Sequence, residues 1–352
     1  MKKVSLKILL SGVLLLTSIW GYAEDFTKKY HKSYKANKNT VLQMINKYGD
    51  MKIINWDNDE IDITVTITVK TSNESKAENT FKKIDITFRQ GGSTVSAITS
   101  INSSIRNTSF KIDYFVKIPA YINVDLSNKY GDLFLNEVNG HANIAVKYGN
   151  FTINKLGRGN EKPVNFISVA YSDAYCDIDQ ANWLKMDVAY AKVSLEEVKA
   201  LMIASKYSTV KVKKVKSIVA ESKYDHPFKI GAVRNFICTG GYSNFDISKL
   251  YNKLELVVKY GNLDLAQVDP GFELIKIDQR YGKSNVHLPK NTSYQLNAEA
   301  AYGSVKYPKQ YKLNRIIDGT ESRVWGTVGI AKDTPKKVEI SSRYGNVQIY
   351  EY

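Results

Sequence analysis

The side chains best suited to bind another molecule are basic residues that recur directly before a repeated tyrosine. They are Lys129, Lys147, Lys206, Lys223, Lys259, Arg280 and Arg343. Cations held in a row attract an anionic polymer such as an acidic polysaccharide. A second basic cluster follows Lys206, and the residues predicted to bind a ligand are Lys206, Lys211, Lys213, Lys223, Lys259 and Arg280. The competing interpretation is a solvated face whose lysine stems cover strand edges.

Residues suited to catalysis or metal binding do not form a recognisable pattern. The four histidines, His31, His141, His226 and His287, are scattered, and no Cys/His metal spacing, nucleophile motif or phosphate-binding loop is present. Asp246 and Asp264 occupy equivalent outward positions, but two carboxylates are too few for Ca²⁺, so we interpret them as surface acids. We therefore assign no catalytic residue, metal or cofactor and expect a protein that is not an enzyme. A carbohydrate-active enzyme, which needs converging carboxylates, stays open as the alternative.

These basic residues are positioned by an internal repeat. Its tyrosines are Tyr130, Tyr148, Tyr171, Tyr190, Tyr207, Tyr224, Tyr242, Tyr260, Tyr281, Tyr302 and Tyr344, with an earlier copy at Tyr48. Successive copies from Tyr130 to Tyr302 lie 17 to 23 residues apart. The last gap is twice that length, and we interpret Trp325-Gly326 as the missing copy. A repeat of this size suits one turn of short strands in a repetitive fold.

Apolar residues alternate with polar ones on both sides of each tyrosine. Ile144 and Val146 precede Tyr148, for example, and Phe151 and Ile153 follow it. This period of two predicts two short strands per repeat, each with one buried face. Stacked repeats would share one core, which predicts an all-β, single-stranded right-handed β-helix (β-solenoid) of about 12 coils. At about 4.8 Å per coil the rod would be roughly 55 Å long.

The parity of the alternation places the tyrosines inward, so we expect their rings to form a stacked structural ladder. Glycine after tyrosine suits a corner with positive φ, and the following Asn or Asp can bond the local backbone. Five middle copies replace that glycine with Ser172, Ala191, Ser208, Asp225 and Ser243. The same register places Cys176 and Cys238 in the core four coils apart, too far for a disulfide.

The chain before the repeat divides into three parts. Residues 1–23 combine a basic start, a short apolar run and a small-residue end, which predicts a cleaved secretory signal peptide and no membrane span. We expect residues 24–38 to be a loose basic lead-in and residues 39–126 to be an irregular β-rich cap, with a helix at residues 75–83 capped by Ser75. A separate β-sandwich is the alternative for this region. Residues 127–352 are the Tyr-Gly repeat, ending in an exposed strand able to pair with another chain.

The chain has 50 basic and 35 acidic residues, a formal charge of +15. Because residues 1–23 contain three lysines and no acid, the expected mature chain carries +12. Both signs are interspersed, which argues against nucleic acid as a partner. No long apolar segment follows residue 23, so no transmembrane span is expected in the mature chain.

The pattern resembles the bacterial putative-adhesin (adhesin-like) family, whose members fold as right-handed β-helices. The residues that carry the resemblance are the signal peptide, Lys47-Tyr48-Gly49-Asp50-Met51-Lys52-Ile53 with Trp56, Lys117-Ile118-Pro119, and the repeated Tyr-Gly-Asn/Asp turns. The resemblance covers most of the mature chain and implies surface attachment, without catalytic residues to transfer. The central turns depart from it by lacking glycine.

Together these observations predict an exported, non-enzymatic β-solenoid that serves as a surface, outer-membrane-associated or periplasmic binding or scaffold module, with anionic polysaccharide or another cell-envelope component as the partner. Self-association through the C-terminal strand is the remaining alternative.

Overall fold

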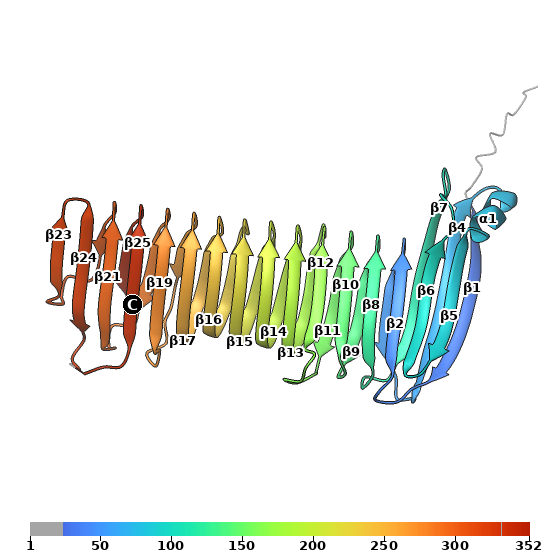
Figure 1. Ribbon diagram of the computed structural model, residues 1–352, viewed down its shortest axis with the longest axis horizontal. Helices are drawn as coiled ribbons and strands as arrows, with labels where there is room; N and C mark the ends of the chain where they lie inside the picture. Colours follow the sequence, from blue (N-terminus) through green and yellow to red (C-terminus); the bar gives the residue numbers. More distant parts are fainter. Residues whose placement is uncertain (1–23, 332) are drawn as a thin grey trace, which may run out of the picture.

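The computed structural model describes residues 24–331 and 333–352, which form an elongated all-β structure (Figure 1). It contains 26 strands in one mixed sheet and one helix, so the predicted all-β class is confirmed. The predicted signal peptide lies outside the described residues. Within the described part of the chain, no helix is long and apolar enough to cross a membrane.

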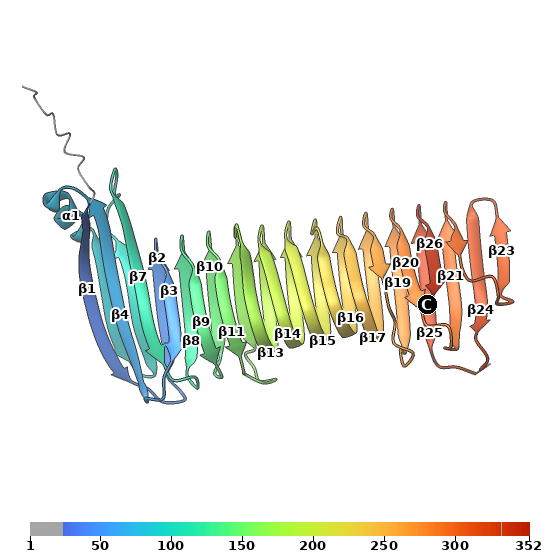
Figure 2. The same cartoon turned by 180° about the vertical axis from the view of Figure 1, so that it is seen from behind.

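Most of the molecule is a stack of repeats. We call each repeat a layer, and it consists of the strand segment directly before one repeat tyrosine and the strand segment directly after it. Equivalent strands of neighbouring layers pair in parallel, so that Val146 lies between Asn128 and Val169. Figure 2 shows the layers following one another along the long axis. The strands from Asn123 to Leu288 are β8(Asn123–Lys129), β9(Leu133–Val138), β10(Ala142–Lys147), β11(Phe151–Leu156), β12(Asn165–Ala170), β13(Tyr175–Ala189), β14(Lys192–Lys206), β15(Thr209–Lys223), β16(Phe228–Gly241), β17(Phe245–Lys259), β18(Leu263–Leu265), β19(Leu274–Arg280) and β20(Ser284–Leu288).

The core is continuous through the stack because alternate residues of every strand point inward. In β10, Ala142, Ile144 and Val146 are buried while the residues between them are exposed. Cys176 and Cys238 are buried free thiols within this core. Burial raises the pKa of the Cys176 thiol to about 11, and it also raises the pKa of Cys238.

The N-terminal end is closed by antiparallel strands and the helix. β1(Glu24–Lys35) pairs with β4(Glu60–Thr71), which pairs with β7(Ser109–Ile118). β5(Ile84–Gly91) pairs with β6(Thr94–Ile101), and α1(Glu74–Phe81) packs mainly against β4, with further contacts to β1 and β5. The prediction of a loose lead-in at residues 24–38 is wrong, because β1 pairs with β4 over its whole length. The helix is capped by the side chain of Asn73, not by Ser75.

Residues expected within the cap form the first layer of the stack instead. β2(Val41–Lys47) lies between β6 and β8, and β3(Met51–Asn55) lies between β7 and β9. The layer of Tyr48 therefore joins the cap to the layer of Tyr130, and the expected boundary at residues 126/127 does not separate cap from stack.

The last layer in the sequence is not the last layer in space. β25(Lys337–Arg343) lies between β19 and β21(Tyr294–Ala301), and β26(Val347–Glu351) lies between β20 and β22(Val305–Lys306). The prediction of an exposed final strand is wrong for most of its length: β20 pairs with all five residues of β26, and on the other side β22 pairs with Val347 and Gln348. Self-association through this strand stays a prediction.

A hairpin closes the C-terminal end of the stack. β24(Glu321–Val328) pairs antiparallel with β21 on one side and with β23(Asn314–Asp318) on the other. Trp325 lies within β24, so the interpretation of Trp325-Gly326 as a missing tyrosine turn is wrong.

Candidate binding surface

Twelve repeat tyrosines line one edge of the stack. Neighbouring ring centroids lie 4.6–5.2 Å apart with interplanar angles of 1–13°, in the order Tyr48, Tyr130, Tyr148, Tyr171, Tyr190, Tyr207, Tyr224, Tyr242, Tyr260, Tyr281, Tyr344 and Tyr302. Each tyrosine is 40–53% exposed, so the prediction that they point inward is wrong. Because the faces cover one another, the edges and hydroxyls are what the ladder offers to a ligand.

The tyrosine side chains point outward because of the backbone conformation of the tyrosines themselves. All twelve have φ between 51° and 63°, in the left-handed region, which interrupts the alternation of inward and outward positions. A left-handed non-glycine residue costs about 1–2 kcal/mol, and a stacked aromatic pair contributes about 0.5–1.5 kcal/mol. The backbone ladder also continues through the turn: the N–H of Tyr207 donates to the Lys223 carbonyl at 2.9 Å.

The glycine after tyrosine is required by close packing, not by positive φ. A Cβ built on Gly282 would lie 1.9 Å from the Gly261 carbonyl oxygen, and one on Gly149 would lie 2.1 Å from that of Gly131. The glycines of successive layers therefore lie too close together for a side chain. The expectation of a positive φ at this glycine is wrong, because the tyrosine adopts it.

In four of the five middle layers a polar side chain fills this position, and Ala191 fills it in the fifth. The carboxylate of Asp225 is buried and accepts from the Ser205 hydroxyl at 2.5 Å, the Ser222 hydroxyl at 2.7 Å and the Ser208 N–H at 2.9 Å. Its own N–H donates to the Ser243 hydroxyl. Burial raises the pKa of the Asp225 carboxyl, against the lowering effect of these hydrogen bonds. This network replaces the glycine contacts of the outer layers.

The Asn or Asp two residues after tyrosine bonds to the next layer. The carboxylate of Asp132 accepts from the N–H of Asn150 at 2.8 Å, and the amide oxygen of Asn262 accepts from the N–H of Lys283 at 2.9 Å. Tyrosine, glycine and Asn/Asp are thus three parallel ladders that hold one edge of the stack. The repeat motif is structural.

The basic residues before the tyrosines form a register row beside this edge. The pairing order is Lys47, Lys129, Lys147, Ala170, Ala189, Lys206, Lys223, Gly241, Lys259, Arg280, Arg343 and Ala301. We call the eight cations of this series the basic row. Lys129 lies 4.8 Å from the centroid of the Tyr130 ring, a cation–π contact. In the part of the chain that the structure describes, none of the eight forms a salt bridge.

The predicted ligand residues divide between two faces. Lys206, Lys223, Lys259 and Arg280 belong to the basic row, on what we call the pre-turn face, formed by the outward residues of the strand segments directly before the tyrosines. Lys211 and Lys213 lie on the post-turn face, formed by the strand segments directly after the tyrosines; in the middle layers both segments belong to one long strand such as β15. Lys213 is paired with Glu196 at 2.6 Å, which raises the lysine pKa, and Lys211 lies 4.4 Å from the Tyr175 ring centroid. The structure therefore does not bring all six together.

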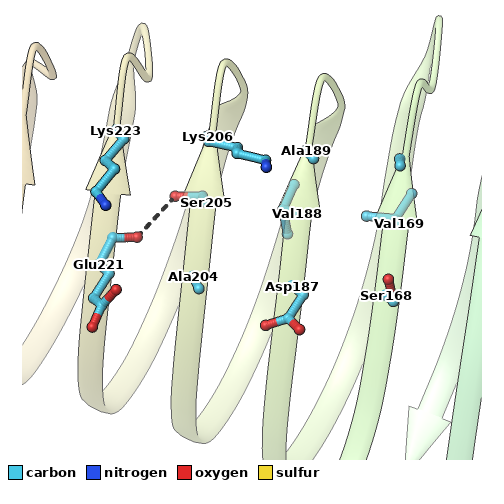
Figure 3. Close-up of a pocket in the computed structure, with 11 residues that line it drawn as sticks. Ser168, Val169, Asp187, Val188, Ala189, Ala204, Ser205, Lys206, Glu221 and Lys223 are labelled. Atoms are coloured by element: carbon cyan, nitrogen blue, oxygen red, sulfur yellow. Dashed lines mark hydrogen bonds between the residues drawn. The ribbon is translucent and has the colours of Figure 1, made fainter.

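A depression of about 430 Å³ lies on the pre-turn face where alanines interrupt the basic row (Figure 3). Ala170 and Ala189 leave the space, and Lys206 extends over it toward Ala189 (Figure 3). Across the strands, Asp187 and Glu221 flank Ala204 in one register row, so two carboxylates accompany the lysines.

The sequence interpretation missed an apolar patch on the same face. Met202, Val219 and Ile237 lie in one register row and are 42%, 53% and 42% exposed. The signal was present in the alternation, since these apolar residues occupy outward positions.

The post-turn face holds the two aspartates considered for calcium. Asp246 and Asp264 are register partners, and Lys229 lies 3.8 Å from the Asp246 carboxylate. Within residues 24–331 and 333–352, no group of three or more His, Cys, Asp or Glu side chains could hold a metal ion.

Several solved structures of bacterial putative adhesins match most of the chain, with TM-scores below 0.5. A putative adhesin from Parabacteroides merdae is 9% identical, with 92% of this chain and 96% of that chain covered and a TM-score of 0.40. A putative adhesin from Bacteroides fragilis is 10% identical, with 92% and 97% covered and a TM-score of 0.29. A putative cell adhesion protein from Clostridium sporogenes is 12% identical, with 93% and 100% covered and a TM-score of 0.19. No protein-family model and no curated protein matches the chain. At these identities and TM-scores, the likeness transfers no ligand and no site residue.

Proposed function

We propose that this chain is an exported, non-enzymatic, adhesin-like module whose layers form a single-stranded right-handed β-helix and whose basic row binds an extended anionic polysaccharide. The observation that supports the proposal is the basic row itself: eight cations in register on one face, with none in a salt bridge among the described residues. Strands of a parallel stack repeat about every 4.8 Å, so neighbouring members such as Lys206 and Lys223 have Cα atoms at that spacing. A flexible polymer with regularly placed carboxylates or sulfates would match such a track.

The surroundings of the row suit a polysaccharide. The tyrosine edges and hydroxyls lie directly beside the cations and can donate hydrogen bonds to sugar oxygens. The depression at Ala170 and Ala189 gives room for one bulkier unit of the polymer. Each cation projects from a strand paired on both sides, so the backbone beneath the row is already ordered and the ordering cost of binding falls on the lysine and arginine side chains.

The proposal is tested with residues 24–352 and a panel of acidic and neutral polysaccharides. We expect binding to the acidic polymers, weakened by salt because bound counterions are released. Changing Lys206, Lys223, Lys259 and Arg280 to Ala should reduce affinity roughly tenfold or more and flatten the salt dependence. The matched control changes Lys211, Lys213, Lys214 and Lys229 to Ala, which removes the same charge from the post-turn face. Equal losses in the two variants would show that net charge, not the basic row, governs binding.

One observation favours a second candidate, a carbohydrate-active enzyme. Asp187 and Glu221 are two layers apart and both line the depression, which places their Cα atoms about 9.6 Å from one another. Inverting glycosidases use two carboxyl groups about 6.5–9.5 Å apart, so the orientation of these two side chains, and not only their Cα spacing, decides whether the pair can act. New reducing ends from the same polysaccharide panel, lost in Asp187→Asn and in Glu221→Gln, would support this enzyme over a binding module.

Export is proposed from the pattern of residues 1–23. The first residue of the protein recovered from outside the cytoplasm should be Glu24, as measured by mass spectrometry of the intact chain. Recovery of a chain that still begins at Met1 would contradict the proposed cleavage.

A further inference from the structure

The C-terminal end of the stack exposes a strand with a free edge. β23 pairs with β24, and among the described residues no strand pairs with its other side. All five of its side chains are exposed, including Ile316 at 56% and Ile317 at 61%. Free edges expose unpaired backbone N–H and C=O groups that can pair with another strand.

Among the described residues, two strands have a free edge at the opposite end of the stack: β5, which pairs only with β6, and β1, which pairs only with β4. β1 carries Lys28, Lys29, Lys32 and Lys35 along its length, and charged residues on an edge discourage pairing. β23 reads Asn-Arg-Ile-Ile-Asp, with one basic and one acidic residue around two isoleucines. A head-to-tail contact with β1 would bring Arg315 against its lysines, which is electrostatically unfavourable. β5 carries only Asp85 and Arg89 as charged residues, and the cross-linking below separates a head-to-tail contact with β5 from pairing of two β23 strands.

The hairpin register shows which backbone groups of β23 are free. Asp318 pairs with Glu321 across the two-residue turn at Gly319, where φ is 54°. Residues flanking a two-residue turn form a hydrogen-bonded pair, and such pairs alternate along an antiparallel ladder. Asp318, Ile316 and Asn314 therefore direct their backbone groups toward β24, and Arg315 and Ile317 direct theirs toward solvent.

The strand is complementary to a second copy of itself. If two copies meet antiparallel about Ile316, the outward groups of Arg315 meet those of the second copy's Ile317, and the reverse pairing forms by symmetry. The two Ile316 side chains face each other, and each Asn314 amide lies opposite an Asp318 carboxylate. No like charges are opposed, and the two-fold arrangement closes with two molecules.

We propose that two copies of this chain associate end to end through antiparallel pairing of β23. The pairing continues the sheet across the junction, with the two stacks extending in opposite directions. An interface of five residues per partner is smaller than the standard interface of about 800 Å² per partner, so the dimer forms reversibly and depends on concentration. This inference is independent of polysaccharide binding, because the basic row lies along the stack and not at its end.

Cysteine cross-linking tests the register. In Ile316→Cys, the two new thiols face each other in a pair with Cα atoms about 4.5 Å apart, within the range of a disulfide. The control is Ile330→Cys, which is 99% exposed but lies outside β23. Native Cys176 and Cys238 are buried and do not compete. With glutathione disulfide as the oxidant, we expect Ile316→Cys to form covalent dimers at least ten times faster than Ile330→Cys.

Sedimentation velocity over a concentration series tests the association without a new thiol. The original chain should shift from monomer to dimer as concentration rises. Ile317→Pro removes an outward N–H without touching the hydrogen bonds to β24, and it should stay monomeric while keeping the circular dichroism spectrum of the original chain. The proposal is overturned if the original chain stays monomeric throughout, if Ile317→Pro dimerises equally well, or if the two cysteine variants cross-link at the same rate.

Discussion

The ring of Tyr344 stacks on that of Tyr281 with their centroids 4.8 Å apart, although the layer of Tyr302 comes between them in the sequence. Tyr302 stacks on the other face of Tyr344, also at 4.8 Å. The layer formed by β25 and β26 is therefore held between two layers that precede it in the chain. Its apolar residues belong to the interior of the stack and not to an end.

That position predicts a large effect of core truncation near the end of the chain. Ile340 is 2% exposed, and Ile340→Ala should cost about 2–5 kcal/mol of unfolding free energy, measured by urea denaturation. Lys337→Ala on the same strand, where the side chain is exposed, should stay within about 0.5 kcal/mol. A small effect of Ile340→Ala would indicate a frayed terminal strand instead of an inserted layer.

The glycine ladder predicts opposite tolerance at equivalent positions. Gly282→Ala should destabilise by about 1–3 kcal/mol or more, because its Cβ meets the Gly261 carbonyl. Ala191 occupies the same place in a middle layer, and Ala191→Gly should cost no more than about 1 kcal/mol, the usual loss for glycine in a strand. Thermal denaturation of both variants gives the comparison, and similar losses in the two would contradict it.

The left-handed tyrosines predict an inverted preference between alanine and glycine. Both Tyr207→Ala and Tyr207→Gly remove the ring contacts, but alanine retains the cost of φ at 51°. Tyr207→Gly should therefore be the more stable of the two by roughly 1 kcal/mol, against the usual order within strands. The midpoints of urea denaturation of the two variants test this order of stability. A higher midpoint for Tyr207→Ala than for Tyr207→Gly would show that the backbone at this tyrosine is not strained.

The buried carboxylate predicts a pH dependence of stability. The folded-state pKa of Asp225 is raised by burial, so the folded protein favours the protonated form. Its contribution to stability is greatest below the unfolded pKa of about 3.9 and falls as pH rises through the raised folded value, then levels off. Asp225→Ser, which copies the serines of neighbouring layers, removes this titration.

The measurement is the unfolding free energy of the original chain minus that of Asp225→Ser, taken from pH 4 to pH 8. We expect this difference to decline with pH, since the other carboxylates are common to both proteins. A difference that rises with pH would mean that the three hydrogen bonds to Asp225 outweigh its burial.

The sequence predicted the strands and the repeat well because both depend on local patterns. The period of two located inward residues such as Ile144 and Val146, and the tyrosine spacing matched the layers. The parity argument was wrong at the tyrosines because a left-handed residue reverses the side on which side chains point, and no pattern in one sequence revealed that φ. The order of the final layers could not be predicted either, because the residues around Tyr302 and around Tyr344 do not reveal which tyrosine each ring stacks on.

The candidate binding surface was predicted only in part, because proximity in the sequence does not show which face of the stack a side chain lies on. The basic row could be read from the residues before each tyrosine, and its alanine interruptions were visible. Lys211 and Lys213 were grouped with it because they are close in sequence, although the turn sends them to the other face. Strand β1 was interpreted as a loose segment because of its lysines, which are typical of a protected edge.

The insertion of β25 and β26 also constrains the order in which the molecule can be completed. A chain that emerges from its N-terminus can assemble the layers up to Tyr281 in sequence. The layer of Tyr302 cannot dock on that assembly directly, because a slot one layer wide must be kept for residues 337–351. This end of the stack can therefore close only after residues 337–351 have been synthesised and have paired with both neighbouring layers. A chain stopped before residue 337 would expose two complementary strand edges, and a separate peptide spanning residues 334–352 could fill the slot.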